Sequence, residues 1–176
     1  MKFLEVDINF SLDYKNGDDK MLADLLDHAK EVRVNGIDII TLNSEDFFIH
    51  LCNHLYKEAS TYPWVKMKRD MTLYKYCDIY LLLNKFSEEE TQALVKRIQE
   101  TQMEKVCSCA AIWTHRLLGI KNHYFLNVAY QTISHQPELL HYVISPSKDK
   151  RYLYDIEDVK ERFFHPDRTT LLQEVK

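Results

Sequence analysis

Glycine is scarce in this 176-residue chain, which contains only Gly17, Gly36 and Gly119. This wide spacing excludes the phosphate-binding loops G-x-G-x-x-G and G-x-x-x-x-G-K-[ST], because both need glycines close together. Only four prolines are present, so collagen-like and proline-rich low-complexity sequences are excluded as well. A chain with so few helix breakers and with long stretches of apolar periodicity is expected to be mostly helical.

Long hydrophobic runs and an excess of positive charge are also absent. No apolar run approaches the about 18–20 residues that cross a bilayer, and the first residues lack the pattern of a signal peptide. The net charge is −4, so a sequence-independent grip on nucleic-acid phosphates is not expected. The short basic cluster of Lys66, Lys68 and Arg69 is best explained as a solvated loop. We therefore expect no membrane partner and find no strong nucleic-acid signal.

The cysteines carry no pattern of a disulfide framework or a metal site. Cys52, Cys77, Cys107 and Cys109 each lie within an apolar helical pattern, which favours buried, reduced thiols in a cytoplasmic protein. Cys107 and Cys109 are two residues apart, so they point to different sides of a helix.

Two β signals precede residue 43. Residues 3–12 alternate between apolar and polar side chains, which predicts a half-buried strand. Asn35-Gly36 separates two further alternating runs and predicts a hairpin, because both turn positions need a positive φ. Unless another chain covers it, the strand at residues 3–12 leaves a pairing edge exposed, so a homodimer is one expectation.

The chain after residue 43 shows helical periodicity throughout, apart from expected loops at residues 60–69 and 145–150. The helices are expected over 44–59, 70–85, 87–101, 103–118 and 122–134, with a short one from Pro137 and a last one capped by Asp155. Ser87 and Glu90 form a capping-box sequence, and Gly119 suits a helix C-terminus.

These elements predict an α+β fold in which a short N-terminal strand and a β-hairpin dock on a mostly helical bundle. We expect a small β element over residues 1–43 and a helical domain over residues 44–176. Helical spacing predicts a core that contains Leu51, Leu55, Tyr76, Leu81, Leu94, Ile98, Cys107, Ala110 and Leu117.

Three polar side chains in the helical half suggest chemistry. His50 and His54 share a helix face, as zinc ligands do, but no third ligand follows at a suitable spacing. Asp78 lies within an apolar segment, where an unpaired carboxylate is costly. We expect it to pair with Lys57 or His54 of the preceding helix; the alternative is an exposed aspartate on the outer stripe.

Glu5 and Asp7 lie side by side on the polar face of the strand at residues 3–12. Two neighbouring carboxylates repel each other unless a cation lies close by. Hard oxygen ligands of this kind hold Mg²⁺ against substrate phosphates in phosphoryl or nucleotidyl transfer. An ordinary exposed strand face explains the two residues equally well.

The segment Val6-Asp7-Ile8-Asn9-Phe10-Ser11-Leu12 resembles the strand that carries the third metal-binding carboxylate in polymerase-β-like nucleotidyltransferases. More narrowly, it is similar to a branch of uncharacterised nucleotidyltransferases. The order of features downstream agrees with that branch. A hairpin at Asn35-Gly36 is followed by Leu51-Cys-Asn-His54-Leu-Tyr-Lys57 and by a loop with a tryptophan. Next comes a run near Asp78 that is similar to the family's Leu-Arg-Trp-Leu-x-Asp-Ile. The resemblance covers residues 3–120.

The resemblance implies that Asp7 is a metal ligand, with Glu5 a second candidate, and that His54, Lys57 and Asp78 form a polar cluster for substrate or structure. It also implies Mg²⁺, a nucleoside triphosphate, and a small-molecule or protein acceptor. The chain departs from the family in lacking a Gly-Ser dipeptide and an Asp-x-Asp pair. In addition, Asn9 replaces a histidine, and Tyr74-Lys75 replaces Arg-Trp.

The missing motifs are expected to prevent this polypeptide from transferring nucleotide on its own. The chain is then a fragment that lacks its N-terminal half, a degenerate paralogue, or one piece of a split protein. The alternative function is a non-catalytic helical module for binding small molecules or proteins.

Overall fold

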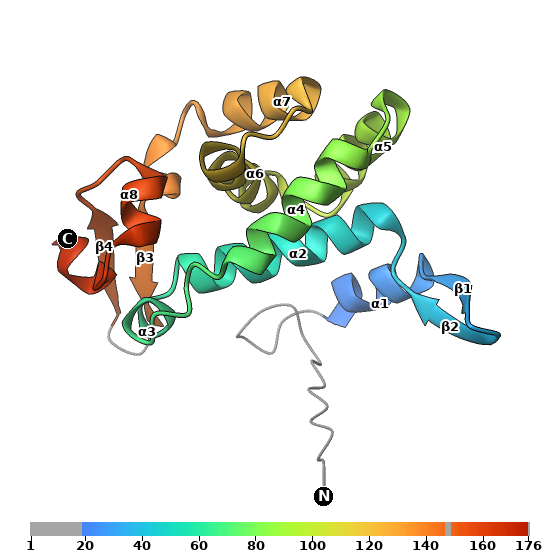
Figure 1. Cartoon of the computed structure of the whole chain (residues 1–176), viewed down its shortest axis with the longest axis horizontal. Helices are drawn as coiled ribbons and strands as arrows, with labels where there is room; N and C mark the ends of the chain where they lie inside the picture. The colour runs from blue at the N-terminus through green and yellow to red at the C-terminus, as the bar shows by residue number, and fades with distance from the viewer. Residues whose placement is uncertain (1–18, 147–148, 176) are drawn as a thin grey trace, which may run out of the picture. The chain divides into compact units, whose positions relative to one another are not determined.

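The computed structural model describes residues 19–146 and 149–175, which form an α+β fold of helices and two small antiparallel sheets (Figure 1). The chain divides into two compact units, one ending at Asn43 and the other beginning at Ser44. The predicted strand at residues 3–12, with Glu5 and Asp7, lies outside the described residues. Across residues 19–146 and 149–175, no helix combines the length and apolar character needed to cross a membrane.

The first unit contains one short helix and the predicted hairpin. Helix α1 (Asp19–Asp27) is followed by β1 (Lys30–Val34) and β2 (Ile37–Thr41), which pair antiparallel with Val34 opposite Ile37. Between the strands, Asn35 and Gly36 have φ values of 52° and 83°. Two consecutive positive φ values are the geometry that an Asn-Gly hairpin turn needs. The hairpin prediction is confirmed.

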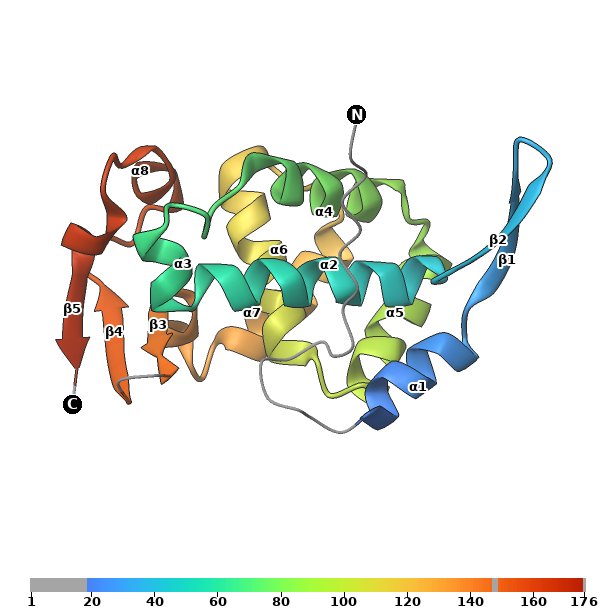
Figure 2. The same ribbon diagram turned by 90° about the horizontal axis from the view of Figure 1, so that it is seen from below.

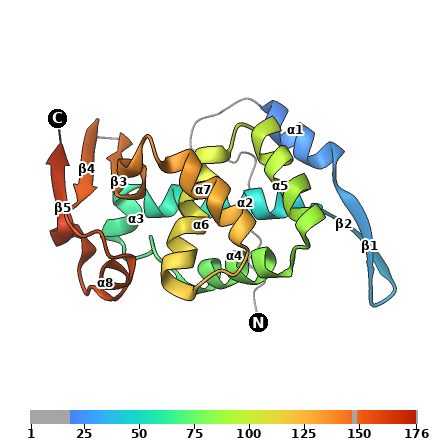
Figure 3. The ribbon, with the colours of Figure 1, turned by 90° about the horizontal axis from the view of Figure 1, so that it is seen from above.

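The second unit is a helical bundle with a small sheet at one end. Its helices are α2 (Ser44–Ala59), α3 (Tyr62–Lys66), α4 (Leu73–Lys85), α5 (Glu88–Glu100), α6 (Glu104–Leu118), α7 (His123–Ile133) and α8 (Val159–Phe164), with 3₁₀ helices η1 (Pro137–Leu140) and η3 (Arg168–Leu171). Helix α6 lies between α2 and α7 and also packs against α4 (Figures 2 and 3). All eight residues from 107 to 114 are buried, because α6 has neighbours on every side.

Two predicted helix ends are confirmed. The Ser87 hydroxyl accepts a hydrogen bond from the Glu90 backbone N–H at 3.2 Å, while Glu90 Oε2 accepts one from the Ser87 N–H at 2.8 Å. This reciprocal pair is the capping box that opens α5. Gly119 ends α6 with a φ of 75°, a conformation that costs glycine little.

The C-terminal sheet corrects the expectation that all strands precede residue 43. Strands β3 (Tyr142–Ser145), β4 (Lys150–Tyr154) and β5 (Leu172–Val175) form an antiparallel sheet in the order β3-β4-β5. Residues 145–150 therefore span the β3–β4 connection rather than a linker between helices. The last helix, α8, is capped by Asp158 rather than Asp155, and the expected loop at 60–69 contains α3.

A buried ion pair ties this C-terminal region to the helical bundle. Asp70, in the α3–α4 connection, accepts hydrogen bonds from Arg168 Nε at 2.8 Å and Nη2 at 2.7 Å. Arg168 Nη1 also donates to the carbonyl oxygens of Phe163 and His165. Both members of the pair are buried, and they are 98 residues apart in the sequence. The pair therefore joins the start of η3 to the α3–α4 connection.

Six of the nine predicted core residues are buried. Leu55, Tyr76, Leu94, Ile98, Cys107 and Ala110 are buried, and Leu51 and Leu117 are half-buried. Leu81 was expected in the core but is 63% exposed. The buried face of α4 instead contains Tyr76 together with Lys75, Ile79 and Leu83, of which the last three are four residues apart. The thiols of Cys52, Cys107 and Cys109 are free and buried as expected, whereas Cys77 is half-buried.

Leu83→Ala is expected to lower the free energy of unfolding by about 2–5 kcal/mol, because it empties a fully buried site. Leu81→Ala, on the same helix, is the matched control and is expected to change it by less than about 0.5 kcal/mol. Urea unfolding of both variants measures the difference. Equal losses would contradict this assignment of the α4 face.

Candidate functional site

A polar network joins α2 to α4 and reaches the surface at one end. Glu58, in the last turn of α2, forms an ion pair with Lys75, in the first turn of α4, and both side chains are buried. The other carboxylate oxygen of Glu58, Oε1, lies 3.2 Å from His54 Nε2. The His54 side chain is 50% exposed. The His54 imidazole is therefore exposed to solvent at one end of the network, and the buried Glu58 carboxylate contacts one of its nitrogens.

The electrostatics of the network follow from its contacts. Burial alone would raise the pKa of the Glu58 carboxyl, but hydrogen bonds from His54 and Lys75 hold that pKa below its ordinary value. The Lys75 ammonium also lies 5.7 Å from the centre of the Tyr74 ring. Glu58 therefore stays ionised and fixes one nitrogen of His54, which is the usual way in which a carboxylate orients a functional imidazole.

The pair His50 and His54 does not form part of a larger ligand cluster. The two rings are 6.2 Å apart between centroids, and burial, together with the neighbouring His54, lowers the pKa of His50. In the part of the chain that the structure describes, no group of three or more His, Cys, Asp or Glu side chains could hold a metal ion. The four-residue spacing of these histidines therefore places them on one face of α2, and no third ligand from the described residues joins them.

Asp78 is an exposed aspartate on the outer stripe of its helix, which was the alternative to its pairing with Lys57 or His54. Because its side chain is exposed on α4, burial does not force such a pair. It lies off the buried stripe of α4 that contains Lys75 and Ile79. Lys57 is half-buried on α2, one residue before Glu58.

Glu58 and Lys75 are the residues that the sequence analysis missed. Two signals could have found them. Glu58 is four residues after His54, a spacing that places both on one helix face. Lys75 shares the four-residue spacing of Ile79 and Leu83, which marks it as a buried lysine in need of a carboxylate.

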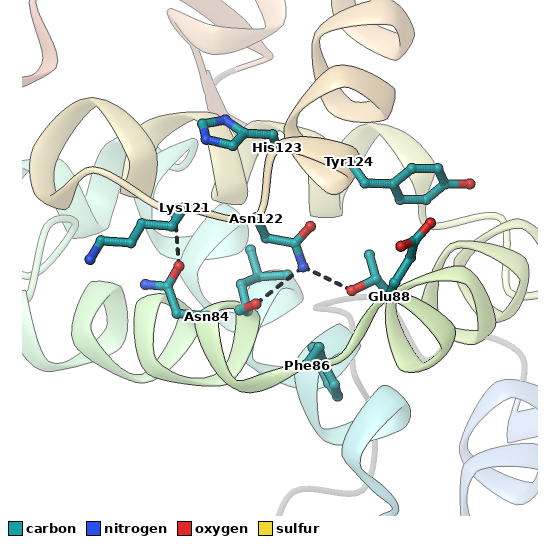
Figure 4. Close-up of a pocket in the computed structure, with 9 residues that line it drawn as sticks. Asn84, Phe86, Glu88, Lys121, Asn122, His123 and Tyr124 are labelled. Atoms are coloured by element: carbon teal, nitrogen blue, oxygen red, sulfur yellow. Dashed lines mark hydrogen bonds between the residues drawn. The ribbon is translucent and has the colours of Figure 1, made fainter.

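A second feature is a hollow of about 410 Å³ where the α4–α5 connection meets the start of α7 (Figure 4). Hydrogen bonds connect the residues that line it. Asn84 Oδ1 accepts one from the Lys121 N–H at 2.7 Å, and Asn122 Nδ2 donates to Thr91 Oγ1 at 2.8 Å. Asn122 also caps α7 by accepting from the Phe125 N–H. The volume is within the range of small-molecule sites.

The groups around this hollow differ from one end to the other. Figure 4 shows the Lys121 ammonium and Asn84 at one end and the Glu88 carboxylate and Tyr124 hydroxyl at the other, with His123 above. Lys121, His123 and Tyr124 are exposed. The hollow therefore offers hydrogen-bond donors and acceptors in separate places, without a buried charged group.

The low pKa of Glu58 predicts a specific dependence of stability on pH. A carboxyl whose pKa is depressed by folding stabilises the fold above its unfolded pKa, near 4.5, and this contribution is lost as the pH falls through the folded value. The gap in unfolding free energy between the parent chain and Glu58→Gln should therefore narrow between about pH 5 and pH 3. Urea unfolding over this range measures it, and a constant gap would contradict the assignment.

A comparison with known protein families finds a match over the segment that contains this network. The profile of the family described as Uncharacterised nucleotidyltransferase matches residues 1–119, which include α2, α4 and the α2–α4 network. No curated protein and no solved structure matches the chain. Because the match covers more than half of the 176 residues, the chain belongs to the uncharacterised nucleotidyltransferase family.

Proposed function

We propose that this chain is the substrate-binding, mainly helical portion of a nucleotidyltransferase and does not transfer nucleotide on its own. The observation that carries the proposal is the family match over residues 1–119 in a sequence that contains neither a Gly-Ser dipeptide nor an Asp-x-Asp pair. Two-metal transfer needs several carboxylates that hold the ions against the phosphates. Asp7 alone, or Asp7 with Glu5, supplies too few of them.

Magnesium and a nucleoside triphosphate enter the proposal through the family resemblance. Asp7 is the proposed metal ligand and Glu5 the second, and both lie outside the described residues. Residues 19–146 and 149–175 do not fit a metal centre of their own. We therefore derive no step through the metal and assign to the described residues only the handling of substrate.

The α2–α4 network is the proposed place of that handling. An exposed imidazole fixed by a buried carboxylate can exchange a proton with a bound substrate, while its partners keep it in place. His54 would contact the substrate, and Glu58 and Lys75 would position it. Lys57 and Asp78, on the same two helices, are proposed as further polar contacts for a small-molecule or protein acceptor.

Calorimetric titration with magnesium and each nucleoside triphosphate tests the proposal. The parent chain should release heat at millimolar nucleotide, and Asp7→Asn or His54→Gln should weaken binding by about tenfold, as loss of a hydrogen bond to a charged group does. His123→Gln, in the hollow of Figure 4, is the matched control and should bind as the parent does. No heat with any of the four nucleotides would contradict the proposal.

A second candidate is a non-catalytic binding module, which the hollow of Figure 4 favours. Its rim at residues 121–124 lies outside the family match, whereas its lining on α4 and α5 lies inside it. The same variants separate the two functions. For any ligand of the hollow, His123→Gln and Lys121→Met weaken binding, whereas His54→Gln leaves it unchanged.

A further inference from the structure

The hollow where the α4–α5 connection meets the start of α7 has one charge of each sign in its lining. Among the nine described residues that line it, Lys121 and Glu88 are the only ones that carry a charge when histidine is neutral. Figure 4 shows their charged groups at opposite ends of the hollow. The lining is therefore neutral as a whole, but one end is positive and the other is negative.

The Lys121 end offers hydrogen-bond donors. The Asn84 amide oxygen accepts a hydrogen bond from the Lys121 backbone N–H at 2.7 Å, which leaves the Asn84 amide nitrogen as a donor. The Lys121 ammonium is exposed at the same end and supplies further donors. Hydrogen bonds from an ammonium to a carboxylate are stronger than those between neutral groups. This end of the hollow therefore favours a carboxylate.

The opposite end offers hydrogen-bond acceptors. The Glu88 carboxylate accepts hydrogen bonds, and the Tyr124 hydroxyl at the same end can accept one as well (Figure 4). Both side chains are exposed and therefore within reach of a ligand in the hollow. An ammonium group has three donors and no acceptor, so it can donate to both of these groups. This end of the hollow therefore favours an ammonium.

The lining between the two ends is partly apolar, and hydrogen bonds hold it in place. Leu83 and Phe86 contribute apolar surface, and Figure 4 shows Phe86 between the charged ends. Asn122 Nδ2 donates to the Leu83 carbonyl oxygen at 3.2 Å and to Thr91 Oγ1 at 2.8 Å. These bonds connect the start of α7 to both α4 and α5. The hollow is therefore formed before a ligand binds, and it suits a ligand with an apolar middle.

We propose that this hollow binds a short peptide, with the terminal carboxylate at the Lys121 end and the terminal ammonium at the Glu88 end. This inference rests on the second candidate function, a binding module, and names its ligand. A single α-amino acid cannot place its charges at opposite ends, because one carbon carries both. A peptide separates them by about 3.4 Å per extended residue.

The charge of the lining separates a peptide from other ligands. A peptide with two free ends is neutral overall and matches a lining with one charge of each sign. A nucleotide brings an excess of negative charge, which Lys121 alone would have to compensate while Glu88 repels it. A neutral sugar would use neither charge. The electrostatic match therefore favours the peptide over both alternatives.

Titration of the ¹⁵N-labelled chain with the tripeptide alanyl-leucyl-alanine, followed by NMR, tests the proposal. The backbone amides of residues 84–91 and 121–124 should shift saturably at millimolar peptide, whereas those of His54 and Lys75 should not. The N-acetylated and the C-amidated peptide each lack one terminal charge, and each should bind about two- to fivefold more weakly, the range for one exposed ion pair. Equal affinity of all three peptides would overturn the proposal.

Two variants assign the ends of the peptide. Lys121→Met should bind the free and the C-amidated peptide equally, because the group that distinguishes them is gone. Its matched control is Lys85→Met, which removes an exposed lysine of α4 that does not line the hollow and should keep the difference. Glu88→Gln should likewise bind the free and the N-acetylated peptide equally, whereas Glu89→Gln, in the same first turn of α5, should not. Preferences that persist in Lys121→Met and Glu88→Gln would overturn the assignment.

The same spectra separate this inference from the function on which it rests. Saturable shifts of the amides of the hollow with glucose or with a nucleoside triphosphate, but none with the tripeptide, would support a binding module and overturn the peptide as its ligand. No shift with any of these probes up to about 20 mM would contradict both the peptide and the binding module. Shifts at His54 with a nucleoside triphosphate test the α2–α4 network separately.

Discussion

Asp70→Asn is expected to lower the free energy of unfolding by about 3–5 kcal/mol, the largest effect of any single change considered. The substitution leaves Arg168 buried and without a negative partner, although its Nη1 keeps two carbonyl contacts. Because the pair joins residues 98 positions apart, the loss should also loosen η3 and β5. Urea unfolding gives the energy, and amide hydrogen exchange of β5 gives the local effect.

The control for this prediction is Asp38→Asn in the hairpin. Asp38 and Arg33 form an exposed pair at 3.5 Å, so its loss should change stability by less than about 1 kcal/mol. The double variant Asp70→Asn with Arg168→Met should recover part of the single loss, since the unpaired buried charge is then gone. Simple additivity of the two single losses would refute the contact.

Lys75→Met is expected to lower the free energy of unfolding by about 3 kcal/mol. It leaves the Glu58 carboxylate buried, and the loss is at the lower end for a buried pair because His54 remains in contact with Glu58. Lys96→Met is the matched control. Lys96 forms an exposed pair with Glu100 at 3.7 Å, so its replacement should change stability by less than about 1 kcal/mol.

The double variant Lys75→Met with Glu58→Leu distinguishes an ion pair from simple packing. Replacing both charges with apolar groups should restore much of the stability that Lys75→Met loses. A double variant as unstable as the sum of the two single ones would show that Lys75 contributes through its aliphatic stem rather than through Glu58.

The parts of the fold that depend on local chemistry were predictable from the sequence. The Asn35-Gly36 turn, the Ser87 capping box and the Gly119 helix end each depend on residues close together in the chain, and each is confirmed. The C-terminal sheet was not predicted. Its strands have four or five residues, and α8 and η3 separate β5 from its partner β4 in the chain. No local periodicity therefore predicts this sheet.

The network on α2 and α4 was predictable only in part. His54 was predicted in a polar cluster, with Lys57 or His54 as the partner of Asp78, because Asp78 stood out among apolar neighbours. The α4 stripe at Lys75, Ile79 and Leu83 is rotated from the stripe that was expected, and this rotation exposes Asp78 and Leu81. Which face of an apolar-rich helix becomes buried depends on its packing partner, here α6 and α2, and not on composition alone.

The most direct test of the central claim is a nucleotide-transfer assay with the purified 176-residue chain. Labelled nucleoside triphosphates are incubated with Mg²⁺ or Mn²⁺, with and without added acceptors, and with the Asp7→Asn and His54→Gln variants as controls. We predict no labelled product from the chain alone, because it contains neither a Gly-Ser dipeptide nor an Asp-x-Asp pair and two-metal transfer needs several carboxylates. Robust transfer by the isolated chain would contradict the account, whether or not the two variants change it.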